Sequence, residues 1–250
     1  MTDWPILVLT LAGDEGRRAP LVAALDSAGL SHELVEGIDA RKGLPAQYEA
    51  MVDREHARQA LRRPMSDGEF ACALSHRAIH QMILDRNLPG AIVLEDDALL
   101  DRHFADFVRA GLYRDVPMAL IYHNFARALP FVRRSVGSFA VMRRVANKAT
   151  GAMAYTLRAD AAARLVQAAT PVRRQADWPC DLYGLGAWFL VPRLVEQRPD
   201  NDETSHLRAE RSRLRDLMGS RRSERSGYAS IGQWLRERVS VRVGRQRGSR

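Results

Sequence analysis

The first forty residues alternate between apolar and polar blocks that predict a strand, a helix and a second strand. Residues 4–13, WPILVLTLAG, are an apolar run containing Pro and ending in Gly, which favours a strand covered on both faces. Residues 14–30 carry apolar side chains at helical spacing, at Leu21, Val22, Leu25 and Leu30. Residues 31–40, SHELVEGIDA, predict a short strand entering a turn. This order favours an α/β fold with right-handed crossovers.

The clearest helix signal lies in residues 66–84, SDGEFACALSHRAIHQMIL. Ser66 stands three residues before Glu69, the spacing of a capping box in which each side chain satisfies the other residue's backbone N–H. Apolar residues then recur at 70, 71, 74, 78, 79, 82 and 83. Residues 87–90, NLPG, end this helix, and residues 91–97, AIVLEDD, predict the next strand.

The remaining blocks complete the predicted α/β order. Charged residues dominate 45–64 and favour a loop or loose helix, whereas the apolar runs predict strands at 118–124, at 151–157 and, as one strand or a pair, at 187–197. Residues 158–169 predict a helix that Pro171 closes. We therefore expect a mostly parallel central sheet flanked by helices, in a region spanning 1–206.

The net charge of +8 is concentrated at the C-terminal end of the chain. Residues 207–250 contain 13 Arg against 4 acidic residues, while residues 1–206 contain 25 basic against 26 acidic residues. Within this extension, residues 231–243 place four apolar side chains on one helical face, at Ile231, Trp234, Leu235 and Val239. The extension is therefore either a partly amphipathic helix suited to an anionic surface or a disordered solubilising tail.

Targeting and redox signals are weak. The chain has no stretch of eighteen apolar residues, and its first residues carry Asp3 and Pro5 where a signal peptide has a basic flank and an apolar run. We expect a cytoplasmic protein. Cys72 and Cys180 are isolated in the sequence and match no metal-binding spacing, so both are expected to be reduced and buried.

Three consecutive acids, Glu95, Asp96 and Asp97, directly follow the apolar run of residues 91–94. Ligands bind at the carboxyl ends of strands in open α/β sheets. Because side chains alternate along a strand, Glu95 and Asp97 are expected on one side and Asp96 on the other. Two carboxylates on one side suit a hard divalent cation. The alternative is that the acids cap the following turn or face solvent.

The residues around these acids resemble the core of the family 25 glycosyltransferases, which include lipooligosaccharide galactosyltransferases. The family shows a Gly-Glu-aliphatic-Gly-Cys-x-x-Ser-His helix and an aliphatic strand ending in Glu-Asp-Asp. The matching residues are Gly68, Glu69, Cys72, Ser75, His76 and Glu95 to Asp97, with Ala71 replacing the second Gly. The resemblance continues through residues 6–18, 35–43, 151–166 and 177–182. Thr10 and Arg158 depart from the Asn and Ser that are usual there.

This resemblance implies a GT-A-like fold, with residues 1–206 as the catalytic domain, and inverting transfer of a hexose from a UDP-sugar, galactose being the commonest. The acceptor is a saccharide or glycolipid of lipooligosaccharide, lipopolysaccharide or another surface glycan. It also implies dependence on Mn²⁺ or Mg²⁺. Asp97 is the first expected metal ligand, Glu95 the neighbour contacting metal-bound water or ribose, and His206 a late ligand or a plain surface residue.

The other site residues follow from the same resemblance. Donor-binding residues are expected at Thr10, Leu11, Arg17, Arg18, Asp39, Ser75, His76, Glu95 and Asp96. Asp181 is the expected base for the acceptor hydroxyl, with Asp177 in reserve, and each is alternatively a helix-capping acid. Trp178 and Tyr183 offer a sugar-stacking platform or ordinary packing. His76 and His80 have a zinc-compatible spacing but lack a third ligand in the sequence.

Two other functions compete with this prediction. A metal-dependent phosphohydrolase would use the same acids and histidines, and a nucleic-acid-binding protein would use the Arg-rich extension. The negative body argues against the second, so no nucleic-acid partner is expected. The extension instead suggests peripheral contact with the inner face of the cytoplasmic membrane.

Overall fold

The computed structural model describes residues 4–198 and 231–243, and within them the strands form a nine-stranded sheet and a separate two-stranded one. The strands are β1 (Ile6–Thr10), β2 (His32–Glu36), β3 (Gly90–Glu95), β4 (Ala98–Leu100), β5 (Met118–Leu120), β6 (Phe125–Val136), β7 (Ala140–Thr150), β8 (Ala154–Arg158), β9 (Ala187–Val191), β10 (Val195–Gln197) and β11 (Val241–Val243). The helices are α1 (Glu15–Ser27), η1 (Ala46–Met51), α2 (Arg54–Leu61), α3 (Asp67–Asp85), α4 (Phe104–Ala110), η2 (Leu112–Asp115), α5 (Ala159–Ala168), α6 (Leu182–Leu185) and α8 (Ile231–Val239).

The large sheet is mixed, with the order β11-β6-β7-β9-β5-β8-β3-β1-β2. Strands β2, β1 and β3 are mutually parallel, as are β5 and β9. Strand β8 is antiparallel to both β3 and β5, so the two parallel groups run in the same direction on either side of it. The predicted α/β class is confirmed, and the arrangement is compatible with a GT-A-like fold.

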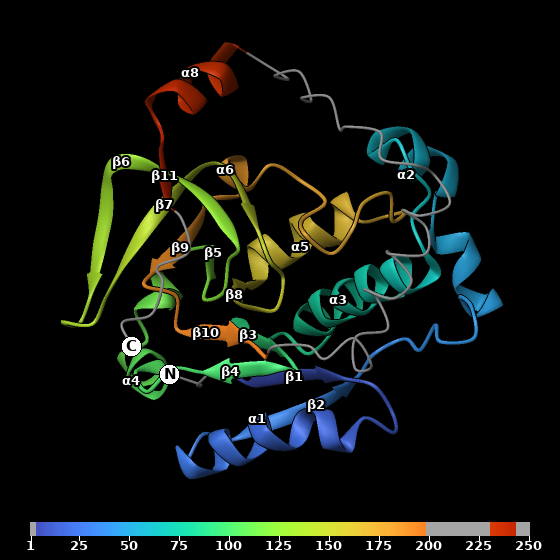
Figure 1. Ribbon diagram of the computed structural model, residues 1–250, viewed down its shortest axis with the longest axis horizontal. Helices are drawn as coiled ribbons and strands as arrows, with labels where there is room; N and C mark the ends of the chain where they lie inside the picture. Colours follow the sequence, from blue (N-terminus) through green and yellow to red (C-terminus); the bar gives the residue numbers. More distant parts are fainter. Residues whose placement is uncertain (1–3, 199–230, 244–250) are drawn as a thin grey trace.

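Helices cover both faces of the central strands, which explains why β1 is buried at every position and apolar from Ile6 to Leu9 (Figure 1). Ile6 and Val8 pack in one core with residues of α1 and α4. Leu7 and Leu9 point to the opposite face and pack in a second core with residues of α3 and α5. Side chains that alternate across a strand must all be apolar when both faces are buried.

The predicted capping box of α3 is present. The Ser66 hydroxyl accepts a hydrogen bond from the Glu69 backbone N–H at 3.1 Å, and the Glu69 carboxylate accepts one from the Ser66 N–H at 3.1 Å. Glu69 is fully buried and also receives two hydrogen bonds of 2.7 Å from the Arg63 guanidinium. The start of α3 is therefore set by a satisfied buried charge, which places the helix against the sheet.

The structure differs from the sequence prediction in the middle of the chain. The strand expected over 118–124 is limited to β5, whereas residues 45–64 form η1 and α2, in line with the loose-helix alternative. The long antiparallel pair β6 and β7 was not predicted, because its residues interleave Arg with apolar positions. Its outer residues are exposed while Ala126, Ala128 and Val145 are buried.

Part of the Arg-rich extension is built into the sheet. Residues 231–239 form a helix, α8, as one of the two alternatives had it, and β11 pairs antiparallel with β6. Arg127 of β6 donates to the Ser240 hydroxyl at 2.7 Å and to the Glu237 carbonyl oxygen at 2.8 Å. Among the described residues, the helices are too short or too polar for any of them to traverse a bilayer.

Replacing Ser66 tests the capping box. We expect Ser66→Ala to lower the free energy of unfolding by about 1 kcal/mol, because the Glu69 N–H loses its acceptor in a buried site. Urea unfolding monitored by circular dichroism measures this. Ser27→Ala is the matched control, since its exposed hydroxyl donates to Ala23 near the end of α1 and its loss should change stability by less than about 0.5 kcal/mol. Equal unfolding midpoints for the two variants would contradict the capping role.

Candidate functional site

The carboxyl ends of β1 and β3 lie side by side, because the two strands are parallel and Leu9 pairs with Glu95. Strand β3 ends at Glu95, and Asp96 and Asp97 occupy the turn before β4. We call these three residues the acidic turn. The Thr10 hydroxyl donates to Asp96 Oδ2 at 3.0 Å, which joins the ends of the two strands. The acids therefore gather where open α/β sheets bind ligands.

Arg17, in the first turn of α1, contacts both aspartates of the acidic turn. Its Nε lies 2.6 Å from Asp96 Oδ1 and its Nη2 lies 2.8 Å from Asp97 Oδ2. Both carboxylates are buried, and Arg17 keeps a quarter of its side chain exposed. The alternation expected of an extended strand thus stops at Glu95, and Asp96 and Asp97 turn toward the same cation. The structure places the predicted donor residues Thr10, Arg17 and Asp96 in one network.

Asp97 is the least satisfied member of the acidic turn. Its Oδ2 also accepts from the Gln197 amide at 3.2 Å, whereas its buried Oδ1 has no hydrogen-bond partner in the described part of the chain. Burial raises the pKa of Asp97 to about 6, and repulsion from Glu95 adds to this, with Arg17 acting in the opposite direction. Burial also raises the pKa of Asp96, against the effect of Arg17. The single guanidinium of Arg17 therefore does not fully offset the burial of Asp97 and its repulsion from Glu95.

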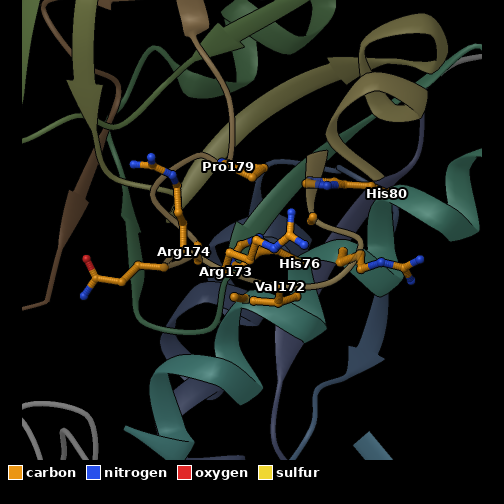
Figure 2. Close-up of a pocket in the computed structure, with 11 residues that line it drawn as sticks. His76, His80, Val172, Arg173, Arg174 and Pro179 are labelled. Atoms are coloured by element: carbon orange, nitrogen blue, oxygen red, sulfur yellow. The ribbon is translucent and has the colours of Figure 1, made fainter. Parts of the chain in front are cut away.

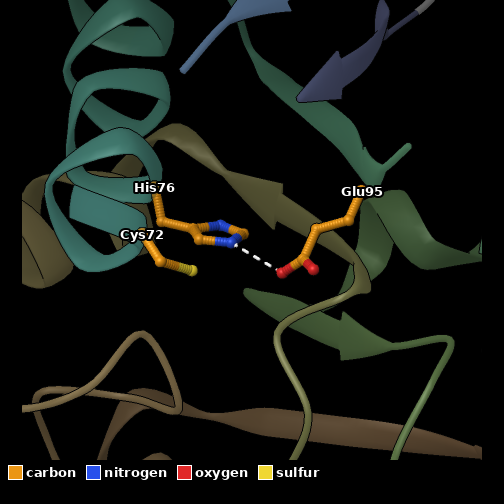
Figure 3. A group of neighbouring side chains, drawn as sticks. All are labelled: Cys72, His76 and Glu95. Atoms are coloured by element: carbon orange, nitrogen blue, oxygen red, sulfur yellow. Dashed lines mark hydrogen bonds and ion pairs between the residues drawn. The ribbon is translucent and has the colours of Figure 1, made fainter. Parts of the chain in front are cut away.

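Glu95 faces a buried chain of hydrogen-bonding rings. His76 Nε2 lies 3.0 Å from Glu95 Oε1, and His76 Nδ1 lies 3.0 Å from the Tyr155 hydroxyl. The same hydroxyl lies 2.8 Å from His80 Nε2. Burial lowers the pKa of His80 to about 3, so this ring stays neutral near pH 7. His76 thus orients the Glu95 carboxylate (Figure 3). His76 is itself held by the Tyr155 hydroxyl.

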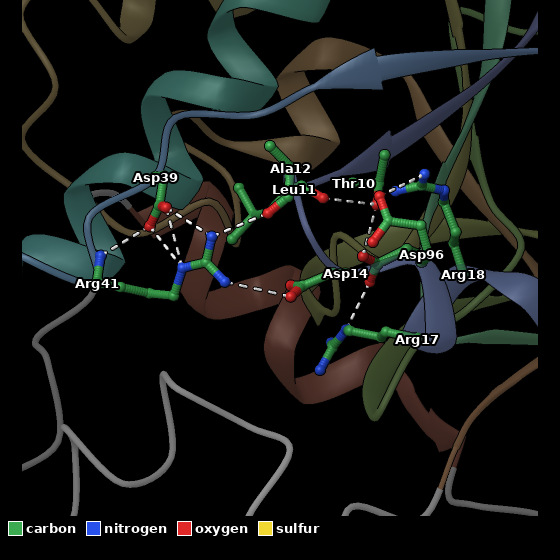
Figure 4. A network of polar contacts seen from close by, with 10 residues as sticks. Thr10, Leu11, Ala12, Asp14, Arg17, Arg18, Asp39, Arg41 and Asp96 are labelled. Carbon is green, nitrogen blue, oxygen red and sulfur yellow. Dashed lines mark hydrogen bonds and ion pairs between the residues drawn. The ribbon is translucent and has the colours of Figure 1, made fainter.

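A second polar network joins the loop after β1 to the segment after β2 (Figure 4). Arg41 pairs with Asp39 at 2.7 Å, approaches Asp14 at 3.3 Å and donates to the Ala12 carbonyl at 2.9 Å. Leu11 accepts a backbone hydrogen bond from Asp14 in the same loop. The predicted donor residues Leu11 and Asp39 are thus tied together through Arg41.

Two other predicted donor residues have local partners. The Ser75 hydroxyl accepts from the Ile38 N–H at 2.8 Å and donates to the Ala71 carbonyl at 2.7 Å, so it fastens α3 to the segment after β2. Arg18 pairs with the exposed Glu15 at 3.0 Å and does not join Arg17 on the acidic turn.

The two candidate bases are both held by backbone N–H groups. Asp181 caps α6 by accepting from Tyr183 N at 3.1 Å and Gly184 N at 3.3 Å, and half of its side chain is exposed. Asp177 Oδ1 accepts from Gly151 N at 3.0 Å. Asp181 is therefore a helix-capping acid, as the alternative interpretation had it. Its carboxylate nevertheless remains accessible to solvent. His206 lies outside the described residues.

The predicted sugar platform is divided between two environments. Trp178 is buried and packs edge-on against Tyr155, with ring centroids 5.1 Å apart. Tyr183 instead lies between two guanidinium groups, with Arg236 at 3.9 Å and Arg144 at 5.0 Å from its ring centroid. The two rings therefore do not form a common exposed surface.

A pocket lies between α3 and the segment after α5 (Figure 2). His76 and His80 line it from α3. Three further lining residues are basic, namely Arg77, Arg173 and Arg174. Neither this pocket nor the contact of Tyr155 with both histidines was predicted from the sequence. The four-residue spacing of His76 and His80 did indicate that the two rings lie in one environment. Tyr155 is 79 residues from His76, so spacing alone does not reveal their contact.

Removing Arg17 tests whether the buried aspartates depend on it. We expect Arg17→Ala to lower the free energy of unfolding at pH 7.5 by about 3 kcal/mol, because two buried carboxylates lose their cation. Arg18→Ala, which removes an exposed pair, should cost less than about 0.5 kcal/mol.

The same pair of variants gives a pH test. The folded-state pKa of Asp97, about 6, lies above its ordinary value of 3.8, so its ionisation costs stability as pH rises through about 6. Arg17 reduces that cost, and the difference between wild type and Arg17→Ala should shrink when the pH falls from 7.5 to 4. Urea unfolding at both pH values measures it, and a difference that grows in acid would refute the pairing.

Comparisons with known proteins agree with this geometry. Residues 3–182 match the family model described as glycosyltransferase family 25 (LPS biosynthesis protein). Procollagen galactosyltransferase 2 from Homo sapiens is 26% identical over 102 residues, which make up 40% of this chain and 16% of that protein. The chain thus matches only a small part of that relative's length. The family model, in contrast, spans well over half of the 250 residues, including the acidic turn, α3 and β8. The chain belongs to glycosyltransferase family 25.

Proposed function

We propose that this family 25 glycosyltransferase transfers a hexose, in the first place galactose, from a UDP-sugar to a saccharide acceptor with inversion. The observation that carries the proposal is the buried Oδ1 of Asp97, which has no partner among the described residues at the carboxyl ends of β1 and β3. The similarity to the human procollagen galactosyltransferase 2 supports galactose as the first sugar to test.

The acidic turn fits a hard divalent cation, Mn²⁺ or Mg²⁺. Its three carboxylates face one guanidinium, so about two negative charges remain when all are ionised. Asp97 would hold the cation through its unpartnered oxygen, and Glu95 lies near enough to raise the pKa of Asp97. When bound, the cation neutralises charge that develops on a diphosphate leaving group. Arg17 offers a second positive charge on the same side.

Inversion by direct displacement requires a carboxylate that accepts the acceptor's hydroxyl proton. We keep Asp181 as the proposed base, because half of its side chain is exposed while two backbone N–H groups fix its orientation. Asp177 remains the reserve. The basic pocket beside His76 supports an acceptor that carries phosphate or carboxylate groups, as surface glycolipids do.

Binding of the donor tests the proposal directly. We expect UDP-galactose with Mn²⁺ to raise the melting temperature of the wild-type protein, and Asp97→Asn to bind UDP at least tenfold more weakly, a loss of about 1.4 kcal/mol. Asp115→Asn, a change at an exposed acid in η2, is the matched control and should bind like the wild type. Isothermal titration calorimetry measures both affinities.

Product analysis separates the enzyme classes. Slow formation of UDP and free hexose in the absence of acceptor supports a transferase, whereas release of inorganic phosphate supports a phosphohydrolase. Normal donor binding by a folded Asp97→Asn variant would remove Asp97 from the donor site.

We also propose that α8 contacts an anionic membrane surface. Ile231, Leu235 and Val239 recur every four residues on this helix and are 80%, 51% and 58% exposed. Exposed apolar side chains on one face beside Arg236 and Arg238 are typical of helices that lie in the membrane interface. The enzyme would then work where a lipid-linked acceptor is anchored.

Vesicle binding tests this placement. The double variant Ile231→Ser with Leu235→Ser should sediment with phosphatidylserine vesicles about tenfold less than the wild type, because it loses most of its exposed apolar surface on α8. Phe131→Ser is the control, since it removes an apolar side chain that is 91% exposed on β6. Equal binding by the double variant and the wild type would exclude α8 as the contact.

A further inference from the structure

We propose that Cys72, His76 and Glu95 form a second metal site, one that binds a thiophilic divalent cation such as Zn²⁺. The Cys72 sulfur, a ring nitrogen of His76 and a carboxylate oxygen of Glu95 all lie within 4.8 Å of one another (Figure 3). Thiolate, imidazole and carboxylate are the three ligand types that zinc takes from proteins.

The fold brings these ligands together from two elements. Cys72 and His76 are four residues apart on α3, so their side chains project from the same face of the helix. Glu95 ends β3, and its Oε1 lies 3.0 Å from His76 Nε2, so it supplies the third ligand, whereas His80 of the spacing noted in the sequence is not part of the site. His76 is buried, while Cys72 and Glu95 are partly exposed, so a cation can enter from solvent.

The distances already approach those of a bound ion. With Zn–N and Zn–O bonds of about 2.0 Å and a Zn–S bond of about 2.3 Å, the ligand atoms of a tetrahedral site lie about 3.3–3.6 Å apart. His76 Nε2 and Glu95 Oε1 are 3.0 Å apart, which is only slightly shorter. The sulfur has to approach by at most about 1.3 Å. Rotation of the Cys72 side chain is the kind of movement this requires.

The second nitrogen of His76 has the partner that metal-bound histidines usually have. Its Nδ1 lies 3.0 Å from the hydroxyl of Tyr155, which lies 2.8 Å from His80 Nε2. When Nε2 binds the cation, the ring proton resides on Nδ1 and is donated to Tyr155, whose own proton is donated to His80. The Cys72 thiol proton leaves to solvent. This buried chain fixes the ring tautomer and orientation that a metal ligand needs.

The donor atoms distinguish this site from the acidic turn. Asp96 and Asp97 offer only oxygen, which suits Mg²⁺ or Mn²⁺, whereas sulfur and imidazole favour Zn²⁺ and Co²⁺. Glu95 stands between the two sets. Three protein ligands leave a fourth position open, as in zinc sites that bind an exchangeable ligand. The inference does not depend on the proposed donor or acceptor.

Cobalt substitution tests the site in the full-length reduced protein. We expect one equivalent of Co²⁺ to produce a near-ultraviolet thiolate-to-cobalt band and the visible bands of a four-coordinate ion, and Zn²⁺ to abolish them. Cys72→Ser should lose the thiolate band. Cys180→Ser removes the other cysteine and is the matched control that should retain the band. Asp97→Asn should retain it as well, because Asp97 is not a ligand.

A second measurement does not depend on spectra or on the stability of variants. Zn²⁺ should slow alkylation of Cys72 by iodoacetamide at least tenfold, measured by mass spectrometry of the Cys72 peptide, while alkylation of Cys180 is unchanged. A wild-type protein that gives no thiolate band and no protection of Cys72 would overturn the proposal. A band that survives in Cys72→Ser, or that disappears in Asp97→Asn, would also overturn it.

Discussion

Two carboxylates buried side by side need a cation, and the contact of Arg17 with Asp96 and Asp97 meets that need. The contact joins the start of α1 to the turn after β3, and Thr10 joins the end of β1 to the same turn. Because charges held away from water are costly when unpaired, this group of residues fixes how the first helix sits on the sheet.

The same end of the sheet also contains a buried network of polar side chains that is surrounded by apolar residues. The chain from Glu95 through His76 and Tyr155 to His80 passes between α3 and β8, where the neighbouring positions are apolar. Within the described residues it leaves His80 Nδ1 buried without a partner, and the acidic turn leaves Asp97 Oδ1 in the same state. A fold optimised for stability alone would fill these positions with apolar side chains, so the network indicates selection for chemistry.

The sequence predicted those parts of the fold that depend on local patterns. The capping box of α3 and the apolar runs of β1 and β3 each depend on residues close together in the sequence. These three elements therefore begin and end close to the predicted positions. The β6–β7 pair and the docking of α8 depend on contacts between distant residues and could not be predicted this way. Within the site, Asp97 and Arg17 were each identified as candidates, but their contact spans 80 residues. Tyr155 lies in residues 151–166, which resemble the family, but no role was assigned to it because its contacts are with residues distant in the sequence.

Strand β11 has a consequence for how molecules of this protein meet one another. Strand β6 is twelve residues long, and the outer row of its backbone N–H and C=O groups is open to pairing where no neighbour lies beside it. Strand β11 pairs with three residues of β6, and Arg242 at the centre of β11 places a charge at this edge of the sheet. Strand β11 therefore shortens the stretch of β6 backbone that another chain could pair with. This reduces the tendency to aggregate by strand addition, which the exposed side chains of Phe131 and Val132 on β6 would otherwise favour.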